Sequence, residues 1–222
     1  QMGKAFLMAA DDNDGLVPDG DTSDQSGVNA GYENYGSVRV HCWVGRPMDS
    51  AKLASNQSLS DKVRGYEAGS LWSYLENPKV YHCPGDNRQN TIDPTVGMLG
   101  HRSYSIGNTL SQRPSSNAAE EACKIRKVSE FVNPSGKIIF LEEAEREQGW
   151  NHRTWNMRLD DEFWVDPFAI FHNDSSTFLF ADGHSDRHKW LQKTTRWMAE
   201  EGIKDVDADY LDEPGTYDDW NW

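Results

Sequence analysis

The sequence predicts an α+β fold in which a short N-terminal helix precedes an antiparallel sheet with long loops. Three observations favour it: apolar residues at helical spacing open the chain, short extended segments follow, and an Asp-Gly pair near residue 182 is typical of a hairpin turn. No repeat and no low-complexity linker divides the 222 residues. We therefore interpret residues 1–190 as one domain and residues 191–222 as a C-terminal helix with an acidic tail.

The first half of the chain contains two expected helices and one expected strand. Residues 1 to about 10 have the helical period, and the polar stretch that follows, to about Gly36, is predicted to be a loop. Residues 37–44 alternate between apolar and polar side chains, which predicts a half-buried strand with Trp43 on its polar side. A helix is expected over residues 60–76, although two glycines weaken it.

The second half reads as short strands separated by turns. Residues 79–83 are expected to be extended, and residues 102–106 are expected to form a short strand. Residues 137–142 form the clearest buried strand. A hairpin with a two-residue Asp-Gly turn is predicted over residues 177–190, because such turns need positive φ angles. A last helix is expected near residues 194–201.

The charge of the chain limits its partners. It has 22 basic and 36 acidic side chains, which gives a formal net charge of −14. Such a surface repels nucleic-acid backbones and anionic bilayers, so no nucleic-acid partner is expected. The longest apolar runs are far shorter than the ~20 residues needed to cross a membrane.

The sequence contains no strong catalytic motif. It lacks a Gly-x-Ser-x-Gly elbow, a glycine-rich phosphate loop and a His-Glu-x-x-His pair. Glu142 and Glu143 are adjacent and would point to opposite faces of a strand, so they cannot form a carboxylate dyad by themselves. We expect a protein that is not an enzyme and that needs no cofactor.

Calcium is the one ion that the composition leaves open. The acidic run near residue 12 offers hard oxygen ligands in Asp11, Asp12 and Asp14. The run does not align with an EF-hand, because the first ligand position falls on Ala10. A calcium site and a solvated acidic loop both remain interpretations of this run, and the solvated loop is favoured.

The most specific pattern is a histidine followed, after nine residues, by Asp-Gly: His172, then Asp182 and Gly183. Four further segments accompany it in order: residues 9–18, 80–86, 103–108 and 132–135. This set resembles a family of type IV pilin-like proteins, the pseudopilins of the type II secretion kind, which are abundant in planctomycetes, verrucomicrobia and lentisphaerae and carry a C-terminal His-x9-Asp-Gly signature.

The resemblance implies a pilin-like fold, with the N-terminal helix stub laid across an antiparallel sheet. It also implies a periplasmic or cell-surface subunit whose partners are other pilin-like subunits. Such proteins carry a hydrophobic N-terminal helix in the inner membrane, and we expect the full-length protein to be anchored by one. Family members often have Asp at the end of the strand that corresponds to residues 137–142, where this chain has Glu142 or Glu143.

The signature residues have two interpretations. His172 and Asp182 bracket a strand and a turn, so the imidazole could hydrogen-bond the carboxylate and lock the hairpin. The alternative is a shared ligand site, which ranks lower because pilin-like domains are scaffolds.

A disulfide between Cys42 and Cys83 is predicted, since both lie in short extended segments and export would place them in an oxidising compartment. Cys123 is an alternative partner. Buried free thiols are nearly as good an interpretation.

An alternative function is carbohydrate binding on the pilin-like scaffold. Residues 144–166 form an elaborated loop without helical or strand period, rich in indoles that can stack on sugar rings and in polar side chains that can bind hydroxyl groups. The candidate ligand-binding residues are Trp150, Trp155, Trp164, Asn151 and Arg153. The competing interpretation is that these tryptophans form a small satellite core.

Overall fold

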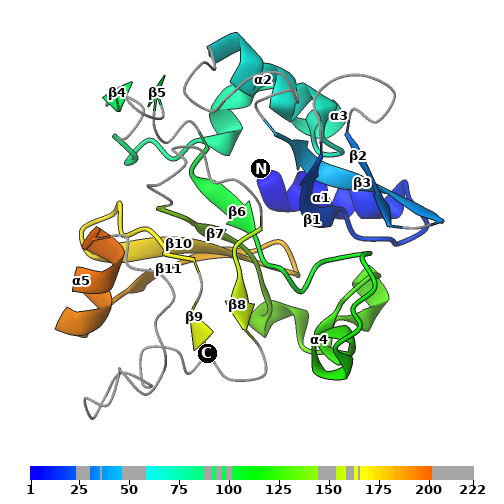
Figure 1. Cartoon of the computed structure of the whole chain (residues 1–222). Coiled ribbons are helices and arrows are strands. Elements are labelled where there is room, and N and C mark those ends of the chain that lie inside the picture. The colour runs from blue at the N-terminus through cyan, green and yellow to red at the C-terminus, as the bar shows by residue number, and fades with distance from the viewer. Residues whose placement is uncertain are drawn as a thin grey trace.

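The computed structural model shows the α+β architecture, with a mixed three-stranded sheet and an antiparallel four-stranded sheet on either side of an N-terminal helix (Figure 1). It describes residues 1–23, 31–35, 37–46, 59–87, 92–93, 97–98, 102–144, 154–158, 163–164 and 166–201. Within these residues no helix is long and apolar enough to span a membrane.

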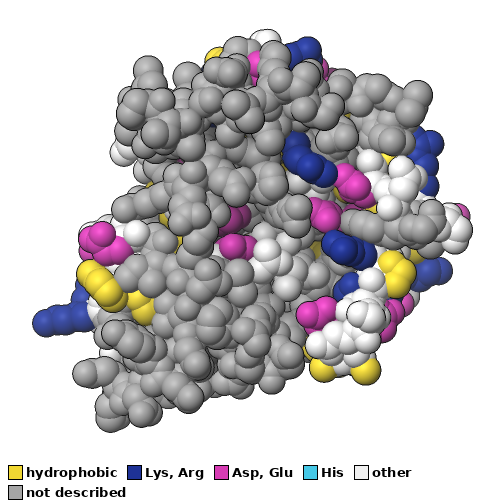
Figure 2. Space-filling view, in the orientation of Figure 1, with side chains coloured by type: hydrophobic (Ala, Val, Ile, Leu, Met, Phe, Trp, Pro, Cys, Tyr) yellow, Lys and Arg dark blue, Asp and Glu magenta, His cyan; other side chains and the backbone are white. Residues whose placement is uncertain are grey.

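The described surface charges are mixed. On the face in view in Figure 2, acidic and basic side chains of the described residues alternate and do not gather into one patch of either sign.

The first sheet was not predicted. It contains β1 (Asp19–Ser23), β2 (Tyr32–Tyr35) and β3 (Val38–Gly45) in the order β1-β3-β2. β1 runs parallel to β3 and β2 runs antiparallel to it. The expectation of a loop to Gly36 is wrong for β1 and β2, because these polar strands have no apolar period. Pairing with β3, and not their own side-chain pattern, makes them strands.

β3 confirms the strand expected over residues 37–44, but Trp43 is not on a polar face. Its side chain is fully buried and lies edge-on to Phe140, with ring centroids 5.3 Å apart. β3 is the central strand of its sheet, and the helix α2 (Leu59–Ala68) also packs against it. Both faces of β3 are covered at Trp43. The alternation of apolar and polar residues along this strand therefore does not mark one face as exposed.

The second sheet confirms the antiparallel prediction. Its order is β11-β10-β7-β6, and every neighbouring pair is antiparallel. The strands are β6 (Tyr104–Ile106), β7 (Ile138–Glu142), β10 (Ser175–Phe180) and β11 (Ser185–Lys189). β7 and β10 are central, which agrees with the apolar character of their sequences.

The turn between β10 and β11 differs from the prediction. Phe180 N–H donates to His184 O over 2.9 Å, so three residues, not two, connect the strands. Only Gly183 has a positive φ, at 90°. A three-residue connection with glycine in the left-handed region is the next most common hairpin turn, and it needs one such residue instead of two.

The helix expected over residues 60–76 is two helices, α2 and α3 (Trp72–Leu75). The break follows Gly69, where an added Cβ would lie 2.3 Å from the Trp43 carbonyl oxygen. One turn earlier in α2, a Cβ at Gly65 would lie 2.7 Å from the Gly45 carbonyl oxygen. The two glycines therefore let helix and strand backbones touch, which is why they are needed despite their poor helix propensity.

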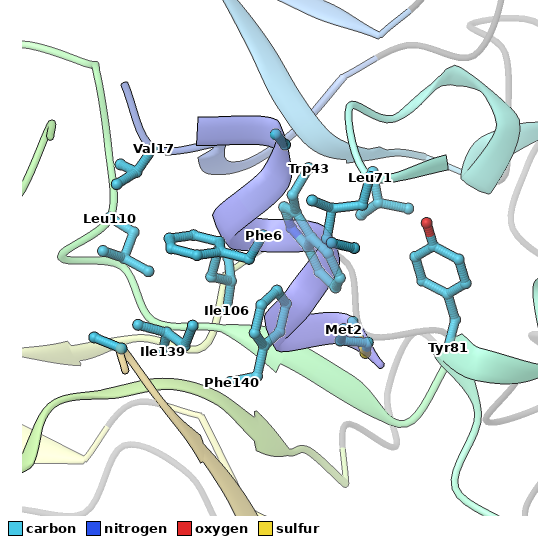
Figure 3. Close-up of a cluster of buried hydrophobic side chains, with 14 of the residues drawn as sticks. Met2, Phe6, Val17, Trp43, Leu71, Tyr81, Ile106, Leu110, Ile139 and Phe140 are labelled. Atoms are coloured by element: carbon cyan, nitrogen blue, oxygen red, sulfur yellow. The ribbon is translucent and has the colours of Figure 1, made fainter. Parts of the chain in front are cut away.

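The helix α1 (Met2–Asp11) confirms the N-terminal prediction and lies in the largest core cluster. Phe6 is fully buried between the sheets, near Trp43 from β3 and Phe140 from β7 (Figure 3). Its ring is T-shaped to Phe140 with centroids 6.2 Å apart. A single helix thus gives both sheets a common apolar surface.

The remaining elements are short. Residues 79–83 are not extended, because Pro78 starts a 3-10 helix there (Pro78–Tyr81) whose cap is the Asn77 side chain. A C-terminal helix, α5 (Lys193–Glu201), is confirmed and packs with Trp190 in a second core cluster. The other described elements are α4 (Ala118–Cys123), the 3-10 turns Val128–Glu130 and Pro134–Gly136, and the strands β4 (Ile92–Asp93), β5 (Gly97–Met98), β8 (Met157–Arg158) and β9 (Phe163–Trp164).

Candidate functional site

Three side chains with metal-binding chemistry meet at one end of the second sheet. Ligand atoms of Cys83, Glu142 and His172 all lie within 4.8 Å of one another. His172 Nε2 is 2.9 Å from Glu142 Oε1 and 3.2 Å from Cys83 Sγ. Cys83 and Glu142 are fully buried, and the His172 side chain is about one third exposed. We call this set the Cys-Glu-His cluster.

Cys83 is held by a compact loop after the 3-10 helix. Its N–H donates to Ser103 Oγ over 2.9 Å, and Ser103 Oγ donates to the buried Asp86 carboxylate over 2.7 Å. The Gly85 N–H donates to Cys83 Sγ over 3.3 Å. A Cβ at Gly85 would approach the Phe171 carbonyl oxygen to 3.0 Å, so glycine is needed where this loop meets the segment of His172.

Glu142 is the last residue of β7, and both of its carboxylate oxygens have partners. Oε1 faces His172, and Oε2 accepts a hydrogen bond of 2.9 Å from the Thr177 N–H of β10. A buried carboxylate needs such partners because burial without them costs several kcal/mol. The irregular register between β7 and β10 lies further along the pair, between Leu179 and Phe180.

His172 is presented by a tight turn before β10. The next two residues, Asn173 and Asp174, both have positive φ, at 55° and 59°. The turn closes with His172 N–H donating to Ser175 O over 3.3 Å. Asp174 is fixed further by Trp190 N–H, which donates to its carbonyl oxygen, and by an ion pair with Arg196. Asn and Asp are the non-glycine residues that best tolerate this backbone conformation.

The geometry does not resemble an activated cysteine nucleophile. A catalytic histidine takes the thiol proton with one ring nitrogen and is oriented through the other, whereas here the thiol and the carboxylate both face Nε2. Burial, followed by the nearby Glu142 charge, raises the pKa of Cys83 to about 12. An ion-free cluster therefore keeps the thiol protonated at neutral pH.

A cleft of about 470 Å³ borders the cluster. Pro84, Tyr104 and Thr177 line it, and each is next to one of the three ligands by sequence or by contact. Burial and then the charges of Cys83 and Glu142 raise the pKa of Tyr104. The cleft therefore adjoins neighbours of the cluster, while the three ligand residues themselves do not line it.

The structure places the two parts of the signature, His172 and Asp182, in different surroundings. The predicted hydrogen bond between His172 and Asp182 is wrong. Asp182 lies in the β10–β11 turn and pairs instead with His184, whose Nδ1 is 2.5 Å and whose N–H is 3.1 Å away. His184 lowers the pKa of Asp182 through these bonds. Asp182 and Gly183 shape the turn after β10, while His172 precedes β10 and faces Glu142 and Cys83.

The predicted Cys42–Cys83 disulfide is also wrong in this structure, where Cys42, Cys83 and Cys123 are free. Cys42 lies on β3 of the first sheet, and Cys83 faces His172 at the end of the second sheet. The alternative of buried free thiols describes Cys42 and Cys83, while Cys123 is exposed.

The acidic run does not form a ligand group. Asp11, Asp12 and Asp14 all lie in the described part of the chain, and the one group of three or more potential ligands found there excludes them. Their side chains are exposed, and Asp12 Oδ2 accepts a hydrogen bond of 2.7 Å from the Tyr74 hydroxyl.

The proposed sugar-binding loop is only partly described. Trp150, Asn151 and Arg153 lie outside the described residues, and for Trp164 only the backbone, in β9, is described. Trp155 is 7% exposed and packs in the second core cluster. The satellite-core interpretation therefore holds for Trp155, which presents too little surface to stack on a sugar.

Sequence reasoning named all three residues of the Cys-Glu-His cluster but not as a group. Each belongs to a different segment, and nothing in their spacing joins a loop, a strand end and a turn. The weak signal was that Cys83 and His172 both lie in segments of the family resemblance. No family model, curated protein or solved structure matches the chain.

Proposed function

We propose that this chain is the extracytoplasmic part of a pseudopilin-like subunit that acts by binding other pilin-like proteins and not by catalysis. In the full-length protein an N-terminal helix would anchor it in the inner membrane, on the periplasmic or cell-surface side. The fold class and the ordered sequence segments support this proposal together.

The observation that carries it is the packing of α1 on the antiparallel sheet. Gly3 lies so close to β10 that an added Cβ would be 2.9 Å from Leu179 Cδ1. Leu7 reaches the hairpin turn, where a Cβ at Gly183 would be 3.3 Å from Leu7 Cδ1. The N-terminal helix therefore lies on the hairpin whose turn contains the signature residues Asp182 and Gly183, as a helix across a sheet.

A third face of α1, turned away from both sheets, is exposed. Lys4, Met8 and Asp11 are exposed, and Met8 retains 53% of its surface. In the proposed assembly this face is the part of α1 that a neighbouring helix can reach.

Site-specific photo-crosslinking from Met8 tests the proposal. The full-length protein, with a photoreactive amino acid at this position, would be expressed in cells of its source organism. We expect crosslinks to other proteins with pilin-like N-terminal helices. The same probe at Leu191, which is 71% exposed between β11 and α5, is the control. Crosslinks that do not exceed this control, or that join only cytoplasmic proteins, would contradict the proposal.

Carbohydrate binding is not retained as a second function. Its one described aromatic side chain, Trp155, is buried. The nearest cleft, about 470 Å³, is lined by polar and charged side chains with one proline, and no described aromatic residue borders it.

A further inference from the structure

We infer that the Cys-Glu-His cluster is a zinc site, in which Cys83, Glu142 and His172 bind one Zn²⁺ and tie three separate segments of the fold together. This inference does not depend on the function proposed above. It rests on donor chemistry, donor spacing and the contacts that already surround the donors.

The donor set suits zinc. A thiolate, an imidazole nitrogen and a carboxylate oxygen are the three ligand types that Zn²⁺ uses in proteins. Calcium and magnesium prefer oxygen ligands only, so a sulfur donor disfavours them. Cys83 supplies the sulfur, His172 supplies Nε2, and Glu142 supplies Oε1.

The spacing is close to that of a tetrahedral site. Bond lengths of 2.0 to 2.3 Å place the ligand atoms of tetrahedral zinc about 3.3 to 3.6 Å apart. The two separations here are 3.2 Å from Nε2 to Sγ and 2.9 Å from Nε2 to Oε1. These two pairs would each have to open by about 0.4 Å to admit the ion, and all three ligand atoms already lie within 4.8 Å of one another.

The surroundings already stabilise a metal-bound form. The Gly85 N–H points at Cys83 Sγ and would support a thiolate, and the Thr177 N–H fixes the second oxygen of Glu142. The positive-φ turn at Asn173 and Asp174 aims His172 inward. Such outer contacts orient ligands in known metal sites. On binding, Zn²⁺ replaces the Cys83 proton, which is released to solvent.

The cleft beside the cluster accounts for the fourth position. Three protein ligands leave one position of a tetrahedral ion open, and water ordinarily fills it. Pro84, Tyr104 and Thr177 line the cleft next to the ligands, and the His172 side chain is about one third exposed, so we expect a solvent molecule as the fourth ligand. Because the ligands come from a loop, a strand end and a turn, binding would stabilise their relative placement.

Cobalt and zinc titrations of the metal-free protein test this inference. Co²⁺ bound to a thiolate gives a charge-transfer absorption band in the near ultraviolet. We expect one equivalent of Co²⁺ to produce this band and one equivalent of Zn²⁺ to abolish it. Zn²⁺ should also raise the melting temperature, since it binds the folded chain preferentially.

Variants assign the band to the cluster. His172→Asn alters a partly exposed side chain and should fold, and it should weaken zinc binding by at least about 100-fold. Cys83→Ser should remove the band. Cys123→Ser, which alters the exposed thiol, is the matched control and should keep both band and affinity.

Two results would overturn the inference. One is a parent protein with no thiolate band and no thermal stabilisation by Zn²⁺. The other is binding that Cys123→Ser removes or that His172→Asn leaves unchanged, since that would place the ion elsewhere. If Cys83→Ser fails to fold, His172→Asn and Cys123→Ser still decide between these outcomes.

Discussion

At the scale of single residues, several polar side chains are buried in this molecule. Asp19 is fully buried in β1, and its carboxylate accepts hydrogen bonds from the backbone N–H groups of Gln112 and Asp21. Burial nevertheless raises its pKa, against the effect of these bonds. Arg102 is buried over the Trp43 ring, 4.6 Å from its centroid. Polar groups of this kind are invisible to an apolar-pattern analysis.

Lys62 provides a pH-dependent prediction. Burial lowers its pKa from 10.5 to about 8. Between these values the unfolded chain binds more protons than the folded chain, so this lysine makes the free energy of unfolding rise with pH. Lys62→Met should therefore be more stable than the parent protein below about pH 8, and the difference should shrink as the pH approaches about 10.5.

Urea unfolding of the parent protein and of Lys62→Met at several pH values measures this difference. Lys79→Met, at an exposed lysine, is the control and should show no such dependence. A difference between Lys62→Met and the parent protein that stays constant with pH would disprove the explanation.

At the scale of elements, the sequence predicted what depends on local pattern. The helix α1, the strands β3, β6, β7, β10 and β11 and the helix α5 all have apolar periods or turn signals, and all were found. β1 and β2 were missed because they are polar strands that exist through pairing with β3. The Cys-Glu-His cluster was missed because its residues are distant in the sequence. Only tertiary structure brings the end of β7 to the turn before β10.

The contact between α2 and β3 gives a prediction about glycine. A Cβ at Gly69 would lie 2.3 Å from the Trp43 carbonyl oxygen, and backbone cannot move aside cheaply. Gly69 directly follows the end of α2, and Gly69→Ala should thus destabilise the protein by about 3 kcal/mol. Gly107→Ala is the matched control, because an added Cβ there would have the Thr109 hydroxyl oxygen as its nearest neighbour, 3.8 Å away. Equal melting temperatures for the two variants would refute the close-contact explanation.

At the scale of the whole molecule, α1 packs between two sheets that also touch each other directly through Trp43 and Phe140. Side chains from α1, β3 and β7 meet in one cluster around Phe6 (Figure 3). The sequence predicted a helix on one sheet, and the second sheet makes that helix a central element instead of a cover.

Phe6→Ala tests this arrangement. Truncation of a fully buried phenylalanine typically costs about 3–5 kcal/mol, and here both sheets lose their common surface. We expect thermal unfolding to remain a single transition at a lower temperature. Met8→Ala, on the exposed face of the same helix, should have little effect. Two separate transitions in Phe6→Ala would show that the sheets are stable independently of α1.

Zinc binding requires Cys83, Glu142 and His172 to form one site. Diffraction from crystals grown with Zn²⁺, with data collected on both sides of the zinc absorption edge, tests it most directly. We predict an anomalous peak about 2.3 Å from Cys83 Sγ and about 2.0 Å from both His172 Nε2 and a Glu142 carboxylate oxygen. Crystals in which zinc is bound elsewhere and this position has no peak, or in which Cys83 forms a disulfide, would contradict it.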